Sequence, residues 1–491
     1  MLGMRKSLKG VSAVVMVLGV GVATWASGCG GSGDSVFDPN AGGGGGDGDG
    51  GLGNDGDPVI VDPMSDGGGP TTCTGIQCNI HTCPTGSTTI SGTIYDPAAN
   101  NPLYDVVAYV PNSTPAPLTN GASCASCASL YTGDPIATAL TDATGKFTIQ
   151  NAPDGTNVPL VIQIGKWRKQ IVIPTVKPCQ DNPLPDKSLT LPKNHAEGDI
   201  PMIAISTGGS DTLECLLRRV GLDSSEYNAA GGPGHIQIFH GGGGVNGQHV
   251  IPNTSPGAPE SNVGLWDTSA DLMKYDIVLL SCEGHETKNM NQQALVDYAA
   301  GGGRVFASHF HYAWFNSGPF GADNIATWSA GSNNINNDNQ IKASLVTTLP
   351  NGMPFPKGLA LQTWLGTVGA LTGGELPIVQ AKHNADVSAA NTPSQSWLLT
   401  NPSTNPAGAT EYLSFDTPIG AAPAAVCGRV VFSDLHVGGA SSDNPATAIP
   451  AGCSNAKLSP QEDALEFMLF DLSSCVTPNS VPPSAPPPVV K

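Results

Sequence analysis

Charged residues are scarce in this chain, and positively charged ones are the scarcest. Lysine and arginine together number 21 of 491 residues, against 40 acidic residues, so the formal net charge is −19. Proteins that hold nucleic acids need clustered positive charge to contact the phosphates, and this balance excludes that class. The charged fraction is only 12 %. Coiled coils are rich in charged residues, so that class is excluded too.

Long apolar runs are also scarce. The extended apolar segment at residues 11–26 is shorter than the ~20 residues that a membrane-spanning helix needs. A protein with several membrane-spanning helices is therefore excluded. The segment follows the basic residues Arg5, Lys6 and Lys9, and this order predicts a secretory signal peptide over residues 1–28.

The end of this segment, Ala26-Ser27-Gly28-Cys29, resembles the bacterial lipobox. In that motif small residues precede a cysteine that is lipidated and becomes the new N-terminus; an ordinary secretory cleavage site is the alternative. The resemblance implies lipidation of Cys29 and attachment to a membrane through the lipid. No aspartate directly follows Cys29, which favours the outer membrane. We therefore expect a lipid-anchored protein of the bacterial cell envelope, facing the periplasm or the cell surface.

Glycine and proline are present in excess. They number 62 and 42, about a fifth of the chain, against the usual ~12 %. Residues 29–72 are almost entirely Gly, Asp, Ser, Pro and Asn and predict a disordered tether. Residues 477–491 predict a Pro-rich disordered tail. Between these segments we expect two folded domains, residues 73–197 and 198–476.

The chain has twelve cysteines, and eleven remain once Cys29 carries the lipid. In an oxidising compartment most of these are expected to form disulfides. Six fall in the first folded domain, which predicts three bridges within it. Five fall in the second domain, which leaves an unpaired thiol there. The pair Cys124 and Cys127 is interpreted as part of the disulfide framework, because no second such pair and no nearby histidine accompanies it.

Short strands separated by Gly and Pro turns predict an all-β sandwich over residues 73–197. Residues 90–97, 141–147 and 152–155 resemble the carboxypeptidase regulatory-like domain, a transthyretin-like β-sandwich. That family has no chemistry of its own, so the resemblance implies a spacer or a binding module.

Strands alternate with helices over residues 198–476, which predicts an α/β domain with a parallel sheet covered on both faces. Ser459, Pro460 and Glu462 form a capping box with proline at the first helical position, which predicts a helix start there. In such sheets the ligand crevice lies at the carboxyl ends of the strands, where polar residues concentrate in this chain. The residues expected to bind a ligand there are Gly208, Gly209, Glu283, Ser308, His309 and His436.

Residues 275–280, 297–309 and 428–436 resemble the trehalose-utilisation (ThuA-like) family, which belongs to the class I glutamine amidotransferase-like superfamily. The resemblance implies a flavodoxin-like fold for the second domain. One departure is Leu435, which stands before His436 where the family has glycine before histidine. Residues 312–425 carry no resemblance.

Two chemistries are candidates for this crevice. Cys282-Glu283-Gly284-His285 resembles the amidotransferase elbow, which implies Cys282 as a nucleophile and His285, or else His309 or His436, as its base. A disulfide or an inert thiol at Cys282 is the alternative.

The second chemistry is a metal site. His309 with His311, and Asp434 with His436, each place two ligands on one side of an extended chain, which suits Zn or another divalent ion. Histidines that form hydrogen bonds at the rim of the crevice are the alternative. A serine hydrolase is disfavoured, because no G-x-S-x-G accompanies the glycines after His240.

We therefore expect a membrane-anchored lipoprotein that binds a small polar or carbohydrate ligand through a ThuA-like domain. Two alternatives stay open. One is a hydrolase that uses Cys282 or the His/Asp metal cluster, and the other is a structural envelope protein.

Overall fold

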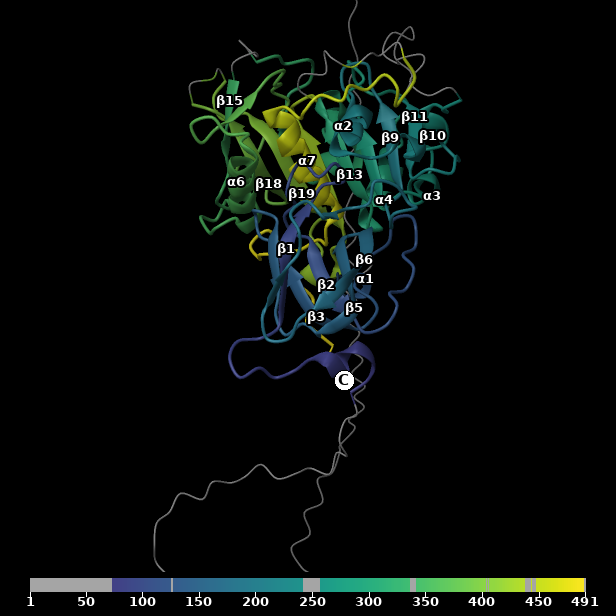
Figure 1. Ribbon diagram of the computed structural model, residues 1–491. Coiled ribbons are helices and arrows are strands. Elements are labelled where there is room, and N and C mark those ends of the chain that lie inside the picture. Colours follow the sequence, from purple (N-terminus) through teal and green to yellow (C-terminus); the bar gives the residue numbers. More distant parts are fainter. Residues whose placement is uncertain are drawn as a thin grey trace, which may run out of the picture. The chain divides into compact units, whose positions relative to one another are not determined.

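The computed structural model describes residues 73–489, except for 125–126, 242–256, 336–340, 403, 405, 438–442 and 444–446. The predicted signal peptide, Cys29 and the predicted tether lie outside the described residues. All described residues belong to one compact unit, Gly69–Lys491 (Figure 1). Within the described ranges, no helix combines the length and the apolar character needed to cross a membrane.

The first part of the chain forms two four-stranded sheets. One has the order β4-β1-β7, with β8 also paired to β1, and the other has the order β3-β2-β5-β6. The strands are β1 (Thr89–Tyr95), β2 (Val107–Pro111), β3 (Pro135–Leu140), β4 (Lys146–Ile149), β5 (Gly155–Ile164), β6 (Trp167–Val176), β7 (Asp181–Pro183) and β8 (Leu189–Thr190).

Both sheets contribute to one hydrophobic core. Ile90 and Ile94 of β1 lie in the same buried cluster as Ala108 of β2 and Leu160 and Ile162 of β5. Burial of such side chains stabilises the fold by roughly 1.5–3 kcal/mol each. The β-rich character predicted for the first part is confirmed.

The second part is built on a ten-stranded sheet with the order β10-β11-β9-β12-β13-β20-β19-β18-β15-β16. The six strands from β10 to β20 are parallel, and the remaining four are antiparallel to their neighbours. The strands are β9 (Ile203–Thr207), β10 (Tyr227–Ala229), β11 (Ile236–His240), β12 (Ile277–Leu280), β13 (Arg304–Ser308), β15 (Ile341–Leu345), β16 (Leu376–Ile378), β18 (Ser394–Thr400), β19 (Thr410–Thr417) and β20 (Gly428–Ser433). A separate pair joins β14 (Thr327–Trp328) to β17 (Ala385–Asp386).

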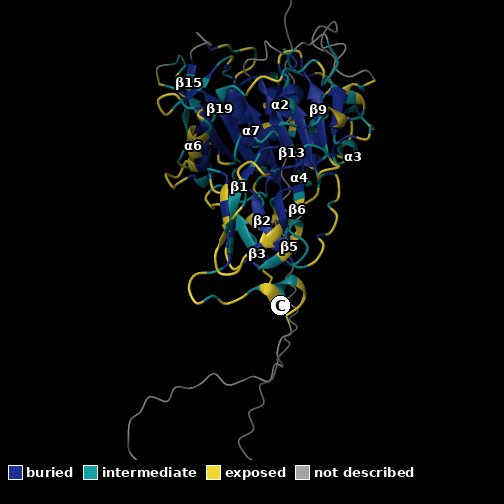
Figure 2. Ribbon diagram, viewed as in Figure 1, coloured by how far each residue is buried: buried dark blue, intermediate teal, exposed yellow. Residues whose placement is uncertain are grey.

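Helices cover both faces of the large sheet. Leu216 of α2 (Leu213–Val220) and Leu465 of α7 (Pro460–Ser473) share a core cluster with Ile203 of β9. Leu295 of α4 (Gln292–Ala300) shares a second cluster with Val278 of β12. The sheet between them is almost wholly buried (Figure 2). The other helices are α1 (Cys127–Leu130), α3 (Ser269–Leu272), α5 (Gly318–Gly321) and α6 (Pro356–Val368).

The predicted start of α7 is confirmed. The Ser459 side chain accepts the backbone N–H of Glu462, and the Glu462 carboxylate accepts the N–H of Ser459 at 2.8 Å. Pro460 occupies the first helical position, where its missing N–H is not needed. Local sequence therefore determines where this buried helix begins.

Four disulfides are present among the described residues: Cys73–Cys78, Cys83–Cys179, Cys124–Cys427 and Cys215–Cys453. They indicate an extracytoplasmic protein. The prediction of three bridges within the first part is wrong, because Cys124 pairs with Cys427 of the second part. The reason is a long-range contact: the N–H of Ala122 donates to the carbonyl of Met273, which directly follows α3, at 3.0 Å, and this places the Cys124 loop against the second part.

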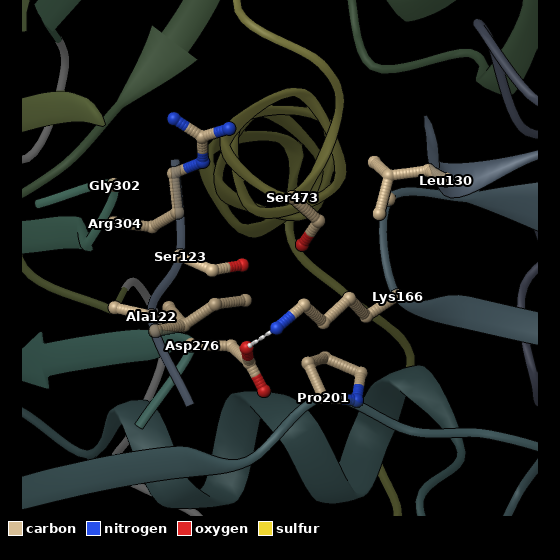
Figure 3. A pocket seen from close by; sticks show the side chains of 11 residues that line it. Ala122, Ser123, Leu130, Lys166, Pro201, Asp276, Gly302, Arg304 and Ser473 are labelled. Atoms are coloured by element: carbon tan, nitrogen blue, oxygen red, sulfur yellow. Dashed lines mark hydrogen bonds and ion pairs between the residues drawn. The ribbon is translucent and has the colours of Figure 1, made fainter. Parts of the chain in front are cut away.

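A recess lies beside this loop, where the first part meets the amino ends of β12 and β13 (Figure 3). The Lys166 ammonium donates to Asp276 Oδ1 at 2.5 Å and to the carbonyls of Thr119 and Gly121. Its three protons thus have three acceptors. The recess is a structural junction at the amino ends of the parallel strands, whereas the predicted crevice lies at their carboxyl ends.

The Pro-rich C-terminal segment is described through Val489 as an extended chain beside β3. The N–H of Val489 donates to the carbonyl of Pro135 at 2.6 Å. The hydroxyl of Thr138 donates to the carbonyl of Pro486 at 2.8 Å. The segment thereby covers the free edge of the sheet β3-β2-β5-β6.

Candidate functional site

The carboxyl ends of β9, β12, β13 and β20 meet at one edge of the large sheet. These strands are parallel and adjacent, with Leu280 paired to Ala307 and Ser308 paired to Ser433. The residues that follow each strand are therefore neighbours in space, although the ends of β9 and β20, Thr207 and Ser433, are 226 positions apart in the chain.

Cys282 follows β12 and is fully buried. Its Sγ lies 3.4 Å from Nδ1 of His309, and its backbone N–H donates to the hydroxyl of Ser308 at 2.9 Å. Burial raises the pKa of the Cys282 thiol to about 12. The group is thus a neutral thiol near pH 7, whereas a cysteine nucleophile needs a thiolate. Cys282 is a free cysteine, outside the four disulfides.

His309 follows β13 with a φ of 41°, a left-handed backbone conformation that is unusual for a residue other than glycine. Its Nε2 lies 3.2 Å from the carbonyl oxygen of Ser332. That contact requires the ring proton on Nε2, so the lone pair of Nδ1 is directed at Cys282 Sγ and at His436. The strained backbone supports this orientation of the ring.

His436 completes a cluster of three side chains. Its Nε2 lies 3.1 Å from Nδ1 of His309, and the ligand atoms of Cys282, His309 and His436 lie within 4.8 Å of one another. Burial lowers the pKa of His309 to about 3, with the neighbouring His436 as a second cause, and lowers the pKa of His436 to about 4. Both rings are therefore neutral near pH 7, the state in which imidazole binds metal ions.

The structure does not bring His311 to this cluster. Nε2 of His311 donates to the carbonyl of Ser281 at 2.9 Å, and Nδ1 accepts the indole N–H of Trp314 at 3.1 Å. The hydroxyl of Thr287 also lies 3.0 Å from Nδ1. Both ring nitrogens are thus occupied inside the protein, and His311 has a structural role.

Asp434 is also directed away from the histidines. Its Oδ2 accepts the backbone N–H groups of Asn384 at 2.7 Å and Ala385 at 3.0 Å. Of the four residues predicted to hold a metal, His309 and His436 come together and Asp434 and His311 do not. Cys282 takes part instead.

His285, the predicted base for Cys282, lies elsewhere. Its Nδ1 is 3.0 Å from the carbonyl oxygen of Glu286 and 3.8 Å from the carboxylate of Glu283. The imidazole that contacts the thiol is that of His309. Glu283 itself is buried, with the hydroxyl of Thr287 at 3.4 Å.

The predicted glycines form the turn between β9 and α2. A Cβ at Gly208 would overlap the carbonyl oxygen of Cys282, and that carbonyl accepts the N–H of Ser210 at 3.0 Å. Gly208 therefore allows the turn to pack against the Cys282 loop. Gly209, the next residue of the turn, is exposed.

Sequence reasoning missed three buried polar residues at the same edge of the sheet: Asp211, Asn384 and Glu411. Asp211 Oδ1 accepts the N–H of Val437 at 2.8 Å and so holds the segment that follows His436. Glu411 had a visible signal, because it is an acidic residue inside the otherwise uncharged run 409–415. Asn384 had none.

Comparisons with known proteins do not identify the chain. It matches no known family model and no curated protein. Among solved structures, the cytoplasmic protein STM3548 from Salmonella typhimurium is similar at a TM-score of 0.30 and 10 % identity, over 56 % of this chain and 99 % of that one. Two interface mutants of a type II cohesin–X-dockerin complex from Acetivibrio cellulolyticus give TM-scores of 0.15 and 0.16 at 16 % identity, over 29 % and 28 % of this chain and 75 % and 85 % of theirs. Scores this low carry no argument about fold or function.

Proposed function

We propose that this chain is an extracytoplasmic lipoprotein that binds a transition metal ion through Cys282, His309 and His436 and, through that ion, a small polar ligand. The observation that carries the proposal is the convergence of three buried ligand atoms, from β12, β13 and β20, within 4.8 Å of one another.

The spacing of these atoms fits a metal ion. Zn–N distances of 2.0–2.1 Å and a Zn–S distance of 2.3 Å imply tetrahedral edges of about 3.3 Å between two nitrogens and about 3.6 Å between nitrogen and sulfur. The distances in this chain are 3.1 Å from His309 to His436 and 3.4 Å from His309 to Cys282. Small shifts of the side chains would bring the three atoms to these values.

The chemistry of the donors fits as well. One thiol and two neutral imidazoles are ligands for Zn²⁺ and other late transition metals rather than for Mg²⁺ or Ca²⁺. The Nε2–H of His309 donates to the carbonyl of Ser332, the outer hydrogen bond that metal-binding histidines usually make. Cys282 would lose its thiol proton on binding. The charge of the metal ion would stabilise the thiolate and so offset the high pKa that the thiol has in the metal-free protein.

Three protein ligands leave one position of a tetrahedron for water or a small ligand. A metal ion with such a position supplies Lewis-acid chemistry, so this site also accommodates the hydrolase alternative. A cysteine nucleophile is disfavoured, because the thiol is buried and neutral.

The order of the strands supports a flavodoxin-like assignment and the resemblance to ThuA-like proteins. Numbered along the chain from β9 and without the edge strand β10, the five parallel strands have the order 2-1-3-4-5, which is that of flavodoxin-like sheets. The point where this order reverses lies between β9 and β12, beside Cys282. Ligands of doubly wound sheets bind at such points.

The proposed location has separate support. The lipobox-like residues before Cys29 favour lipid attachment, and the four disulfides favour an extracytoplasmic compartment. The Gly-rich tether would let the folded part stand roughly 35–40 Å from the membrane.

The metal proposal is tested with the full mature chain, oxidised and freed of metal, by titration with Co²⁺ and Zn²⁺. We expect one ion per chain and, for Co²⁺, the intense visible bands and the sulfur charge-transfer band of a tetrahedral thiolate complex. Cys282→Ser removes the charge-transfer band, and His436→Gln weakens binding at least tenfold. His285→Gln, close in sequence but outside the cluster, is the matched control and leaves binding unchanged. Binding that is no tighter in the wild type than in Cys282→Ser overturns the proposal.

A further inference from the structure

A second group of polar side chains is buried on the antiparallel pair β19–β20, next to the metal cluster. Glu411 of β19 is fully buried, and its carbonyl accepts the N–H of Asp434 at 2.8 Å. Asp434 directly follows Ser433, the last residue of β20, so it stands opposite Glu411 at the end of the strand pair. The two carboxylates act electrostatically on each other and therefore lie close together.

Most of the oxygens in this group have no hydrogen-bond partner. Both carboxylate oxygens of Glu411, Oδ1 of Asp434 and Oδ1 of Asn384 are buried and unpartnered. Buried polar groups are almost always paired, since an unpaired one loses its hydration without compensation. A glutamate with two unpartnered oxygens needs a particular explanation.

Asn384, just before β17, connects Asp434 to the segment after β14. Its backbone N–H donates to Asp434 Oδ2, and its side-chain amide donates to the carbonyls of Ser329 and Gly331 at 2.6 and 2.8 Å. These bonds assign the amide nitrogen of Asn384 to the two carbonyls, and the amide oxygen is left without a hydrogen-bond partner. The unpartnered atoms of the group are thus all acceptors.

Positive charge near the group is limited among the described residues. Lys382 acts electrostatically on both Glu411 and Asp434. Its ammonium, however, donates to the side chain of Asn334 at 2.5 Å in an exposed contact. Asp386, the other charged group acting on Asp434, adds a further negative charge. The negative charge of these carboxylates therefore exceeds the positive charge near them, which favours a bound cation.

We propose that Glu411, Asp434 and Asn384 form a second cation site, for a hard divalent cation and specifically Ca²⁺. Carboxylate and amide oxygens are the donors that hard cations prefer. Two unpartnered oxygens on one glutamate fit bidentate coordination, which Ca²⁺ accepts and Mg²⁺, with its strict octahedron, uses little. The site uses none of the three residues proposed to bind the transition metal.

A cation at this position joins three separate segments: β19, the end of β20 and the loop before β17. Asp434 follows the last residue of β20, and His436 stands two residues later. The hard cation would thus hold the segment that carries His436.

The test is Ca²⁺ binding to the full mature, oxidised chain after chelator treatment, followed by calorimetry and by thermal unfolding with and without Ca²⁺. We expect one Ca²⁺ per chain, weaker binding of Mg²⁺ and a higher melting temperature with Ca²⁺. Glu411→Gln, which keeps the shape of the side chain, weakens Ca²⁺ binding at least tenfold. Glu197→Gln, at an exposed position that is distant in sequence from Glu411, is the matched control and leaves Ca²⁺ binding unchanged.

The direction in which Glu411→Gln changes the stability, measured with and without Ca²⁺, is a second test of the proposal. Without Ca²⁺, Glu411→Gln is at least as stable as the wild type, since it removes a buried unpaired acid; with Ca²⁺ it is less stable. No saturable Ca²⁺ binding by the wild type, or equal affinity in Glu411→Gln, overturns the proposal. Cys282→Ser retains Ca²⁺ binding, so failure at one site is distinguished from failure at the other.

Discussion

His309 and His311 lie two residues apart, yet only His309 joins the metal cluster. On an extended chain, residues i and i+2 point to the same side, and the sequence analysis assumed that geometry. Strand β13 ends at Ser308, however, and His309 begins a 3₁₀ helix, η5 (His309–Trp314). At three residues per turn, positions i and i+2 are related by a rotation of about 240°, so they point about 120° apart. The candidate ligands were thus identifiable from sequence as histidines at a strand end, but their grouping was not.

His311→Ala tests the structural role given to this residue. The substitution leaves the Trp314 indole N–H and the Ser281 carbonyl without their buried partner, which costs roughly 1–3 kcal/mol for each unpaired group. We expect lower stability in urea unfolding and an unchanged stoichiometry for Co²⁺. Loss of the Co²⁺ site in a variant that still folds would return His311 to the set of ligands.

Cys282 should resist alkylation in the folded protein without metal. Burial and a pKa of about 12 leave almost no thiolate at pH 8, and the side chain is fully inaccessible. Iodoacetamide labelling followed by peptide mass spectrometry is expected to modify Cys282 only after unfolding in guanidinium. Rapid labelling of the native protein at pH 8 would contradict this view and revive the nucleophile.

Asp105 makes stability depend on pH. Burial raises the pKa of this carboxyl from its usual value near 4 to about 7. Between these pH values the folded protein holds a proton that the unfolded chain releases, so stability falls as pH rises from about 4 to about 7. Asp105→Asn, which tolerates the φ of 65° at this position, should flatten that fall by roughly 2–4 kcal/mol.

The measurement is chemical unfolding at a series of pH values. Asp297→Asn, an exposed position on α4, serves as the control and should keep the wild-type profile. An identical slope in Asp105→Asn and the wild type would rule out Asp105 as the source.

At the scale of elements, the sequence located the segments whose signals are local. The capping box of Ser459, Pro460 and Glu462 predicted the start of α7, and the structure has it there. The antiparallel strands β18 and β19 were missed. Nearly every residue of both strands is buried, so neither strand shows the alternation that marks a half-exposed strand. Glu411 was overlooked with them.

Ser459→Ala should destabilise α7 at its N-terminus. The substitution removes the hydroxyl that accepts the N–H of Glu462, and loss of such a cap costs about 1 kcal/mol. Ser459→Thr keeps the hydroxyl and should be close to the wild type. Urea unfolding compares the three proteins; equal midpoints for Ser459→Ala and the wild type would show that packing alone determines where the helix begins.

At the scale of the whole molecule, the disulfide Cys124–Cys427 links two parts of the chain that the sequence presents as separate. Its two residues are 303 positions apart, so breaking it releases a long loop in the unfolded chain. Replacing both cysteines by serine should lower stability by roughly 2–5 kcal/mol.

The short bridge Cys73–Cys78, with a separation of 5, provides the control. Its double serine variant should lose clearly less, because a short loop restricts the unfolded chain less. Thermal unfolding of the two double serine variants measures the stability that each bridge contributes. An equal or larger loss from the short bridge would contradict the loop-length argument.

The pairing of cysteines also constrains how this protein can mature. A chain that crosses a membrane from its N-terminus delivers Cys124 long before Cys427, and Cys215 is 238 residues ahead of Cys453. If the cysteines oxidised in order of arrival, Cys73 and Cys78 would form their native bridge, but Cys83 and Cys124 would pair next and form a wrong one. Native pairing therefore requires either that Cys83 and Cys124 stay reduced until Cys179 and Cys427 have crossed, or that a wrong bridge is exchanged afterwards.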